Sequence, residues 1–369
     1  MSSDVISELI SIADKARVFA SMPYIEGLTP RVFNETGKYQ VHPSEEAVER
    51  REGIFKMDEI GISPLDHGGL YGDAVFEGIL INHGQIFLFK EHLLRWWQSA
   101  KSLSISFPYT IEEMACKILQ TVQQVGFNRN EKGYLRPIIT RGFGNLGIHP
   151  KKCVAPTVYV IASTIQLYPP ETYETGIELA VARQTRRQGR VIIDPNVKSC
   201  NYLNNILGLL ETLHKGKLET MMITARGVVA EATADNIFLV SRHPGWETDP
   251  AQVEIITPSP DYCLVGITRK LIMQNARDLG YTIKEADDML AIDFIGPDRE
   301  CFMTGTGCGL MPIVGIENRA VGDGKPGSIT KRLLAAITGN MKNPENGLGL
   351  QATKDEVLEY MDRPTVFER

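Results

Sequence analysis

A single lysine, Lys198, stands out as the residue most capable of chemistry, because it follows an Asp-Pro bend and precedes Tyr202 by four positions. A lysine amine can hold an aldehyde cofactor as a Schiff base, provided that it is neutral and partly removed from water. We expect Val197, Cys200 and Leu203 to supply its apolar neighbours. A solvated surface lysine is the alternative that this segment alone leaves open.

Two small-residue loops have the character of phosphate sites. Gly266, Ile267 and Thr268 open a predicted helix, so their backbone N–H groups and the positive helix end are available to an anion. Residues 304–307, Thr-Gly-Thr-Gly, offer hydroxyls and bare backbone. Neither loop has the Walker or the GxGxxG pattern. Either loop alone is more often structural, but with Lys198 they indicate pyridoxal phosphate.

The elements that must position these residues begin with a predicted helix over residues 90–103. Its apolar face includes two tryptophans, and Arg95 stands beside them, where it can reach solvent or an anion. Thr110 and Glu113 form a capping box for a second helix that ends at Gly126. Helices and strands that occur in groups, rather than in strict alternation, favour an α+β fold.

Strands are predicted around a glycine-rich stretch, residues 66–78, which carries Tyr71 and Phe76. A hairpin turns at residues 82–85, and a strand over residues 133–140 carries Tyr134 and Arg136. Glu231 is expected in a connection between two strands. For the glycine-rich stretch, a purely structural loop with core aromatics is the alternative.

The domain organisation follows from a Pro-rich segment. We predict an N-terminal extension over residues 1–54, a small domain over 55–166, a linker over 167–175 and a large domain over 176–369. Residues 2–19 have helical spacing, and the extension is interpreted as a packing arm or an oligomer contact.

Composition excludes several classes of protein. The 369 residues carry a net charge of −6, which does not favour binding to nucleic acid or an anionic membrane, and no apolar run has the length of a membrane span. Six scattered cysteines without a CxxC motif predict reduced thiols in a cytoplasmic protein. The seven histidines show no metal-ligand spacing, so we expect no metal.

Several motifs together resemble a known family. VKSCNYLNN, AEATADNIF, GITRKLI and FMTGTG, in this order, are similar to the fold-type-IV pyridoxal phosphate enzymes. DHGGLYGDAVFEG, EHLLRWWQSAKSL and YLRPIITRGFGNLGIHP resemble the branched-chain amino acid aminotransferases of that group. The resemblance spans about residues 55–335. It implies the D-amino acid aminotransferase-like fold: a smaller α+β domain, a larger pseudo-barrel domain, the cofactor between them, and a homodimer or higher homo-oligomer.

The resemblance also implies roles for individual residues. Lys198 would bind the cofactor aldehyde and move the proton, Glu231 would pair with the pyridine nitrogen, and Tyr202 would hydrogen-bond the ring oxygen. The phosphate would be held by Arg95, Ile267, Thr268 and Thr306, with Leu264 against the ring. The substrate would meet Tyr71, Phe76, Tyr134, Arg136, Gly307 and Cys308.

The implied activity is transfer of the amino group between branched-chain L-amino acids (Leu, Ile, Val) and 2-oxoglutarate. The sequence departs from the family pattern at Leu80, where FEGIR is common, at Ala232 and Ala234, and in the loop Gly307-Cys308-Gly309. D-amino acid or (R)-amine aminotransferase and aminodeoxychorismate lyase are the alternatives of the same fold. A catalytically silent scaffold is the alternative outside enzymes.

Overall fold

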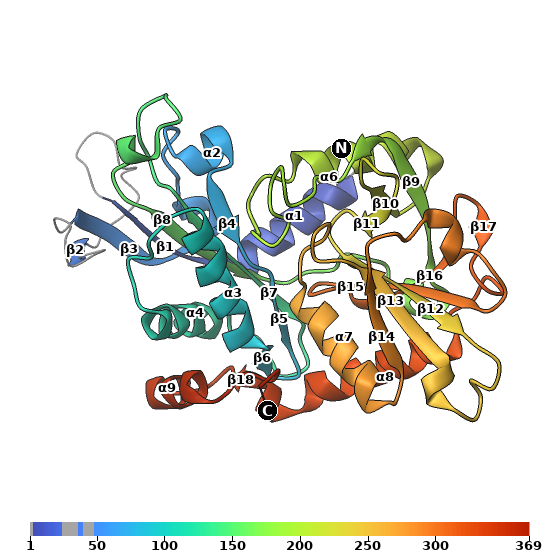
Figure 1. Cartoon of the computed structure of the whole chain (residues 1–369). Coiled ribbons are helices and arrows are strands. Elements are labelled where there is room, and N and C mark those ends of the chain that lie inside the picture. The colour runs from blue at the N-terminus through green and yellow to red at the C-terminus, as the bar shows by residue number, and fades with distance from the viewer. Residues whose placement is uncertain (1–2, 24–35, 40–47, 369) are drawn as a thin grey trace. The chain divides into compact units, whose positions relative to one another are not determined.

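The computed structural model of the chain describes residues 3–23, 36–39 and 48–368 (Figure 1). They form two compact units. Unit 1 comprises Met1–Ile165, Val197–Asn201 and Met341–Arg369, and unit 2 comprises Gln166–Asn196 and Tyr202–Asn340. The expected α+β fold with two parts is confirmed. The predicted domain boundaries stay a prediction. The units differ from them because unit 1 includes the extension and residues 197–201 and 341–369, and unit 2 includes residues 166–175.

The sheet of unit 1 has nine strands among the described residues, in the order β18-β6-β5-β7-β8-β1-β3-β2, with β4 paired to β7. The strands are β1 (Arg17–Pro23), β2 (Thr36–Tyr39), β3 (Val48–Lys56), β4 (Ala74–Phe76), β5 (Ile79–Asn82), β6 (Gln85–Phe87), β7 (Gly133–Thr140), β8 (Thr157–Ser163) and β18 (Gly347–Gly349). The helices are α1 (Ser3–Lys15), α2 (His67–Tyr71), α3 (Phe89–Ser102), α4 (Ile111–Val125) and α9 (Lys354–Asp362).

The core of unit 1 lies between its sheet and helices α3, α4 and α9, where Trp96 and Ile118 are fully buried. Strand β7 alternates between two faces. Leu135 and Ile139 point into this core, whereas Tyr134 and Arg136 stand on the opposite face. The period of two in the sequence therefore separates residues that stabilise the unit from residues that are available to a ligand.

Most predicted boundaries in unit 1 are confirmed. Thr110 and Glu113 form the capping box of α4, and Gly126 ends it in the left-handed region. The β5–β6 hairpin turns at His83 and Gly84, which both have positive φ, as a two-residue turn requires.

The predicted helix over residues 2–19 is wrong in its second part. Helix α1 ends at Lys15, and Phe19 lies in β1, which pairs with β8 and β3. Phe19 is buried in the core of unit 1, so pairing and packing outweigh helical spacing there. Strands β1 and β3 make the extension part of the sheet, in agreement with a packing arm. Residues 1–2, 24–35 and 40–47 of that extension lie outside the described residues.

Unit 2 contains a mixed sheet in the order β11-β10-β9-β16-β15-β12-β13-β14, with β17 paired to β16. Its strands are β9 (Ile177–Arg186), β10 (Glu219–Ile223), β11 (Val229–Glu231), β12 (Asn236–Arg242), β13 (Val253–Pro258), β14 (Thr282–Ala286), β15 (Arg299–Gly305), β16 (Gly309–Ile316) and β17 (Arg319–Ala320). Its helices are α5 (Thr172–Thr175), α6 (Leu203–Thr212), α7 (Ile267–Asp278) and α8 (Ser328–Lys342).

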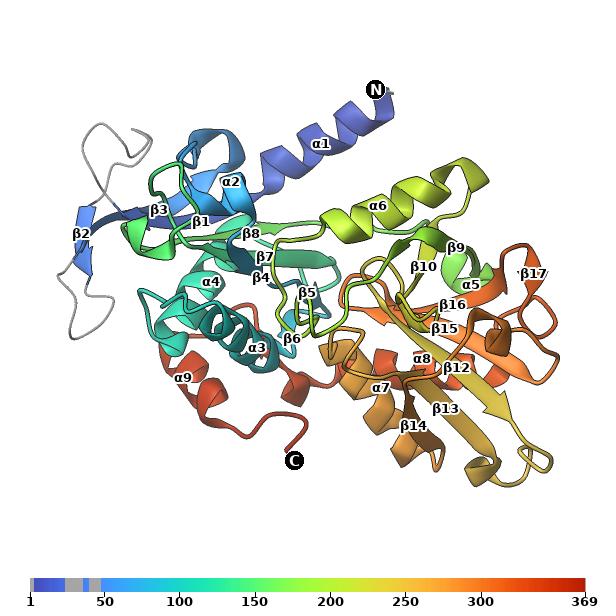
Figure 2. The same ribbon diagram turned by 45° about the horizontal axis from the view of Figure 1, so that its top comes forward.

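Helix α7 packs against β14 and β15 of this sheet (Figure 2). Its inward face carries Leu271, Ile272 and Ala276, all buried. Because these residues recur at helical spacing, the packing of α7 fixes where its N-terminus lies within unit 2. Among the described residues, no helix has both the length and the apolar character needed to cross a membrane.

Candidate active site

Lys198 is held in unit 1 by the backbone of its own short segment. The Lys198 carbonyl accepts a hydrogen bond from Phe76 N at 3.0 Å, and Cys200 N donates to Ala74 O at 2.8 Å. Ser199 forms an isolated antiparallel β-bridge with Val75 of β4. Residues 198–200 thus line the edge of β4, and this pairing sets the direction in which the lysine side chain leaves the backbone.

The Lys198 side chain lies against Phe76, and so does that of Arg136. The distance from Lys198 Nζ to the Phe76 ring centroid is 4.7 Å, and that from Arg136 Cζ to the same centroid is also 4.7 Å. Phe76 is buried and Lys198 is half-buried. An aromatic ring attracts cations to its face, so a single ring gathers two cations here.

Two of the apolar neighbours predicted for Lys198 lie in unit 1 with it. Val197 packs against the core of unit 1, and Cys200 is half-buried. For Leu203 the expectation stays a prediction: it begins α6 in unit 2, and 67% of its surface is exposed. Val191, in the apolar run before the lysine, is 99% exposed in a turn. Phe76 supplies the ring that the local sequence did not reveal.

Arg136 carries a buried nitrogen without a partner. Its Nε is inaccessible to solvent and makes no hydrogen bond within the described part of the chain, while its Nη2 donates to the Tyr134 hydroxyl at 3.4 Å. A Cβ at Gly78 would come within 1.8 Å of the Tyr134 hydroxyl, so glycine is required there. Leu80 lies directly opposite Tyr134 across β5 and β7. The departure at Leu80 therefore falls beside Tyr134.

Arg95 is held by a glutamate that sequence reasoning missed. Glu77 accepts from Arg95 Nε at 2.6 Å and from Arg95 Nη2 at 2.8 Å, and His92 Nδ1 lies 2.8 Å from the same carboxylate. The signal was present in the sequence: a glutamate interrupts the apolar run VFEGIL, and His92 and Arg95 share one helix face three residues apart.

Tyr71, which stays a predicted residue of the substrate pocket, contacts a neighbouring loop. Its hydroxyl donates to the carbonyl of Leu146, and its ring packs edge-on against His67 with centroids 4.9 Å apart. His67 Nε2 lies 2.8 Å from the Asn145 carbonyl oxygen. These contacts anchor residues 145–146 to α2. Within unit 1, Tyr71 is thus grouped with this loop, whereas Lys198, Phe76, Arg136 and Tyr134 form one cluster.

In unit 2, Glu231 lies at the end of β11 and not in the connection that we predicted. It is buried, and its carboxylate accepts from Arg187 Nε at 2.7 Å. Leu264 N and Asn236 Nδ2 lie 3.3 and 3.4 Å from its other oxygen. Arg187 was not predicted, because no local pattern separates it from the other arginines of residues 183–190.

The N-terminus of α7 has the character of an anion site. No side chain in the described part of the chain caps it, and Ile267 and Thr268 occupy its first turn. A Cβ at Gly266 would lie 2.2 Å from Asn236 Oδ1, and Asn236 Nδ2 donates to the Leu264 carbonyl at 2.8 Å. Asn236 therefore connects Glu231 with the start of α7. The backbone N–H groups at such a helix start suit a phosphate.

The loop with Thr306 joins β15 to β16. Thr306 and Gly307 are half-buried, whereas Cys308 is buried with its Sγ 3.4 Å from Asp235 Oδ1. Burial, followed by the charge of Asp235, raises the pKa of the Cys308 thiol well above its ordinary value. The thiol is therefore protonated and donates to Asp235, which fixes the turn. Asp235 was not predicted.

Tyr202, predicted to contact the cofactor ring, is the first residue of unit 2 after the lysine segment and the N-cap of α6. It is half-buried, and its carbonyl accepts from Ile206 N at 2.9 Å. The structure thus distributes the predicted residues over two clusters. Unit 1 holds the lysine and arginines, and unit 2 holds Glu231, the start of α7 and the Thr306 loop.

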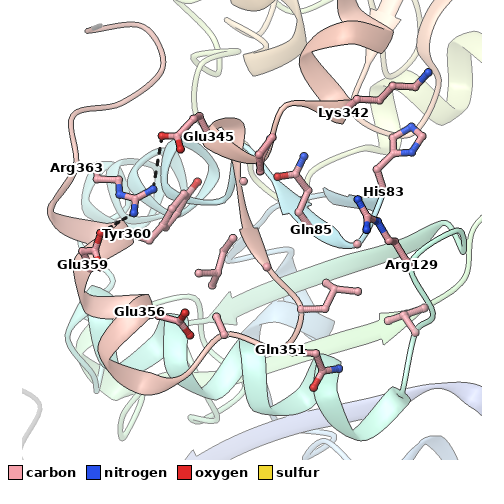
Figure 3. A pocket seen from close by; sticks show the side chains of 18 residues that line it. His83, Gln85, Arg129, Lys342, Glu345, Gln351, Glu356, Glu359, Tyr360 and Arg363 are labelled. Atoms are coloured by element: carbon pink, nitrogen blue, oxygen red, sulfur yellow. Dashed lines mark hydrogen bonds and ion pairs between the residues drawn. The ribbon is translucent and has the colours of Figure 1, made fainter.

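A separate groove of about 780 Å³ opens on unit 1 among the β5–β6 turn, the α4–β7 connection and the C-terminal segment (Figure 3). His83, Arg129 and Lys342 lie on one side, and Glu345 on the other. None of the residues predicted for the active site is among the described residues that line this groove.

Comparison with known proteins identifies the family of this chain. Residues 74–316 match the family model of class IV amino-transferases. A Methanocaldococcus jannaschii protein, provisionally assigned as a branched-chain-amino-acid aminotransferase, is 37% identical over 272 residues, which are 74% of this chain and 88% of that protein.

Solved structures are also similar. The T.th. branched-chain amino acid aminotransferase, with pyridoxamine 5'-phosphate and in complex with N-(5'-phosphopyridoxyl)-L-glutamate, shares 29% sequence identity with this chain. In both structures the match has a TM-score of 0.69 and covers 79% of this chain and 93% of the other. The uncapped start of α7 and the buried Glu231 fit the phosphate and the ring nitrogen of such a cofactor. The chain therefore belongs to the class IV aminotransferases, a family of fold-type-IV pyridoxal phosphate-dependent enzymes.

Proposed function

We propose that this aminotransferase moves the amino group between branched-chain L-amino acids (leucine, isoleucine and valine) and 2-oxoglutarate in two half-reactions. The observation that carries the proposal is the environment of the Arg136 guanidinium. Its guanidinium stacks on Phe76, its Nε is buried without a partner among the described residues, and Lys198 lies over the same ring. A buried donor without a partner is costly, and a carboxylate would satisfy it.

The surroundings of Arg136 suit both kinds of substrate. Phe76 and Tyr134 offer aromatic surface to a branched aliphatic side chain, and Leu80, opposite Tyr134, adds apolar surface. The second carboxylate of glutamate or 2-oxoglutarate needs a charge-assisted partner, which Arg136 would supply. Because stacking holds the guanidinium while no carboxylate is present, the aliphatic substrate does not leave an unsupported cation.

Pyridoxal phosphate, when bound, supplies an aldehyde and an electron-accepting ring. Lys198 would hold the aldehyde and carry the proton to and from the substrate Cα with its Nζ. Glu231, held by Arg187, would bind the pyridine nitrogen, Tyr202 the ring oxygen, and Leu264 would pack on the ring. Arg95, Ile267, Thr268 and Thr306 would bind the phosphate, and the backbone of Gly307 and Cys308 the substrate carboxylate.

Replacing Arg136 with methionine tests the substrate assignment. We expect kcat/KM for 2-oxoglutarate to fall by about 10- to 100-fold, the usual value of a charge-assisted hydrogen bond, and that for 4-methyl-2-oxopentanoate to change by less than about threefold. Arg129→Met, an exposed arginine of the same unit, is the matched control. Equal losses for both oxoacids would refute the role of Arg136. Activity with D-alanine or (R)-phenylethylamine, and none with L-leucine, would refute the branched-chain assignment.

We also propose that the enzyme is a homodimer or a larger homo-oligomer. Helix α6 presents an exposed apolar stripe made of Leu203, Ile206, Leu207 and Leu210, and an exposed patch of this kind is typical of a protein interface. Light scattering should give at least twice the 41.0 kDa mass of the chain. Ile206→Glu should lower this mass, and a fully active monomer at micromolar concentration would contradict the proposal.

A further inference from the structure

Glu77, His92 and Arg95 form a buried group of charged and polar side chains in unit 1. Glu77 stands between β4 and β5, and His92 and Arg95 lie one turn apart on α3. The side chain of Glu77 is 0% exposed, that of His92 2% and that of Arg95 14%. Exposure therefore increases from the glutamate outward to the arginine.

Both oxygens of Glu77 are occupied. Oε1 accepts from Arg95 Nε at 2.6 Å, and Oε2 accepts from Arg95 Nη2 and His92 Nδ1, each at 2.8 Å. Burial by itself would raise the pKa of Glu77, but the charge of Arg95 and the hydrogen bonds of Arg95 and His92 hold it well below its ordinary value. Burial lowers the pKa of His92. His92 is therefore neutral, and its Nδ1–H donates to an ionised Glu77.

This contact constrains Arg95 in a specific way. A guanidinium is planar, and the edge formed by Nε and Nη2 is taken by the carboxylate, so both its plane and its rotation are set. The Nη1 edge necessarily faces away from Glu77. His92 restrains Oε2 from a second direction, which prevents the carboxylate from turning with the arginine.

A purely structural purpose explains this group poorly. Burying a carboxylate is expensive, and apolar side chains of similar volume usually stabilise a core at least as well as a buried ion pair. In α3 the neighbouring Leu93 and Trp96 already provide that packing. A buried acid with a second, neutral donor is instead suited to holding one cation in a fixed orientation.

We propose that Glu77 and His92 are positioning residues that orient the Arg95 guanidinium toward the cofactor phosphate. The inference rests on the proposed function, in which Arg95 is a phosphate ligand. It adds that Arg95 alone is not sufficient and that its affinity for the phosphate depends on the acid behind it. Loss of the Glu77 carboxylate would remove the two hydrogen bonds that it accepts from the guanidinium and would weaken the restraint on its orientation.

The test compares two probes, pyridoxal 5'-phosphate and pyridoxal, which lacks the phosphate. Full-length protein freed of cofactor is titrated with each, and dissociation constants are read from the visible absorbance. Glu77→Gln should weaken pyridoxal phosphate about tenfold and pyridoxal by less than twofold. Glu91→Gln is the matched control, because Glu91 is also a buried glutamate of unit 1, on α3, and accepts from Val366 N. It should change neither constant.

The histidine provides a second test that does not depend on the folding of Glu77→Gln. His92→Asn keeps an N–H close to the position of Nδ1 and should retain the parent affinity for pyridoxal phosphate. His92→Leu removes that donor and should weaken pyridoxal phosphate several-fold without affecting pyridoxal. Equal losses for both probes in Glu77→Gln, or equal behaviour of the two His92 variants, would overturn the proposal. Failure of the parent protein to bind pyridoxal phosphate would instead refute the proposed function.

Discussion

Each of the two clusters of candidate residues contains a close ion pair, and the two pairs have their charges exchanged. In unit 1 the proposed cofactor ligand is a cation, Arg95, and an acid, Glu77, is paired with it. In unit 2 the proposed cofactor ligand is an acid, Glu231, and a cation, Arg187, is paired with it. Each pair has a nitrogen–oxygen distance of 2.6 to 2.7 Å. Each charge that would meet the cofactor is thus paired with a countercharge that need not touch the cofactor.

The units also differ in how they offer donors to a phosphate. In the proposed site, unit 1 would offer a long side chain, that of Arg95, which must lose rotational freedom and which Glu77 and His92 would hold. Unit 2 would offer the first backbone N–H groups of α7, which the helix already holds. These need only space, and Gly266 provides it beside Asn236. A side-chain donor thus needs partner residues that hold its orientation. A backbone donor at the start of a helix needs space, which a residue without a Cβ provides.

The largest expected effect concerns Lys198 of unit 1, the proposed attachment point of the cofactor. Lys198→Ala removes both the attachment of the cofactor and the proton carrier, so transamination of L-leucine should fall by at least about a thousandfold. Borohydride should no longer fix the cofactor to the chain. Lys101→Ala, an exposed lysine of α3, should retain parental turnover. Near-normal activity of Lys198→Ala would remove the basis of the comparison.

The next effect tests the acid and its support in unit 2. Glu231→Gln should lower kcat by about a hundredfold, because a preorganised charge at the ring nitrogen is lost. Arg187→Met keeps the carboxylate but removes its 2.7 Å partner, so a smaller loss of about tenfold is expected. Steady-state rates with saturating cofactor separate the two variants. If Arg187→Met lowered kcat more than Glu231→Gln, Arg187 would contact the cofactor or substrate itself. The parallel between the Glu77–Arg95 and Arg187–Glu231 pairs would then be wrong.

A third variant tests the backbone donors. Gly266→Ala would place a Cβ 2.2 Å from Asn236 Oδ1, so the start of α7 must shift, and affinity for pyridoxal phosphate should fall about tenfold. Gly339→Ala is the matched control, since a Cβ there meets no described atom within 4 Å. In the interior of α8 it should raise the unfolding free energy by about 0.5 to 1 kcal/mol. Unchanged affinity in Gly266→Ala would show that α7 does not hold the phosphate.

The smallest effect is a dependence of stability on pH. The pKa of Glu77 in the folded protein lies below its usual 4.5, so below that pH the unfolded chain binds more protons. The contribution of Glu77 is complete above pH 4.5 and is lost as the pH falls further. The difference in Tm between the parent and Glu77→Gln should therefore be largest at pH 6 to 7 and narrow toward pH 3. A constant difference would show that the carboxyl is not ionised in the folded state.

Much of the fold followed from local patterns. The capping box at Thr110 and Glu113, the left-handed Gly126 and the turn at residues 82–85 were all predicted and are all present. Phe19 was placed in a helix and lies in a strand, because residues 17–23 satisfy their backbone against β8 and β3. Helical spacing was therefore a poor guide where strand pairing and burial in the core compete with it.

The sequence by itself determined the motifs and their order, since capping, tight turns and helix starts depend on residues only a few positions apart. Only the tertiary structure decided which side chains support them. Glu77 and Arg95, Arg187 and Glu231, and Asp235 and Cys308 are 18, 44 and 73 residues apart. A charged or polar side chain takes its partner from whatever the fold buries beside it, and burial makes that partner indispensable. The supporting residues therefore became visible only when the strands and helices had brought them together.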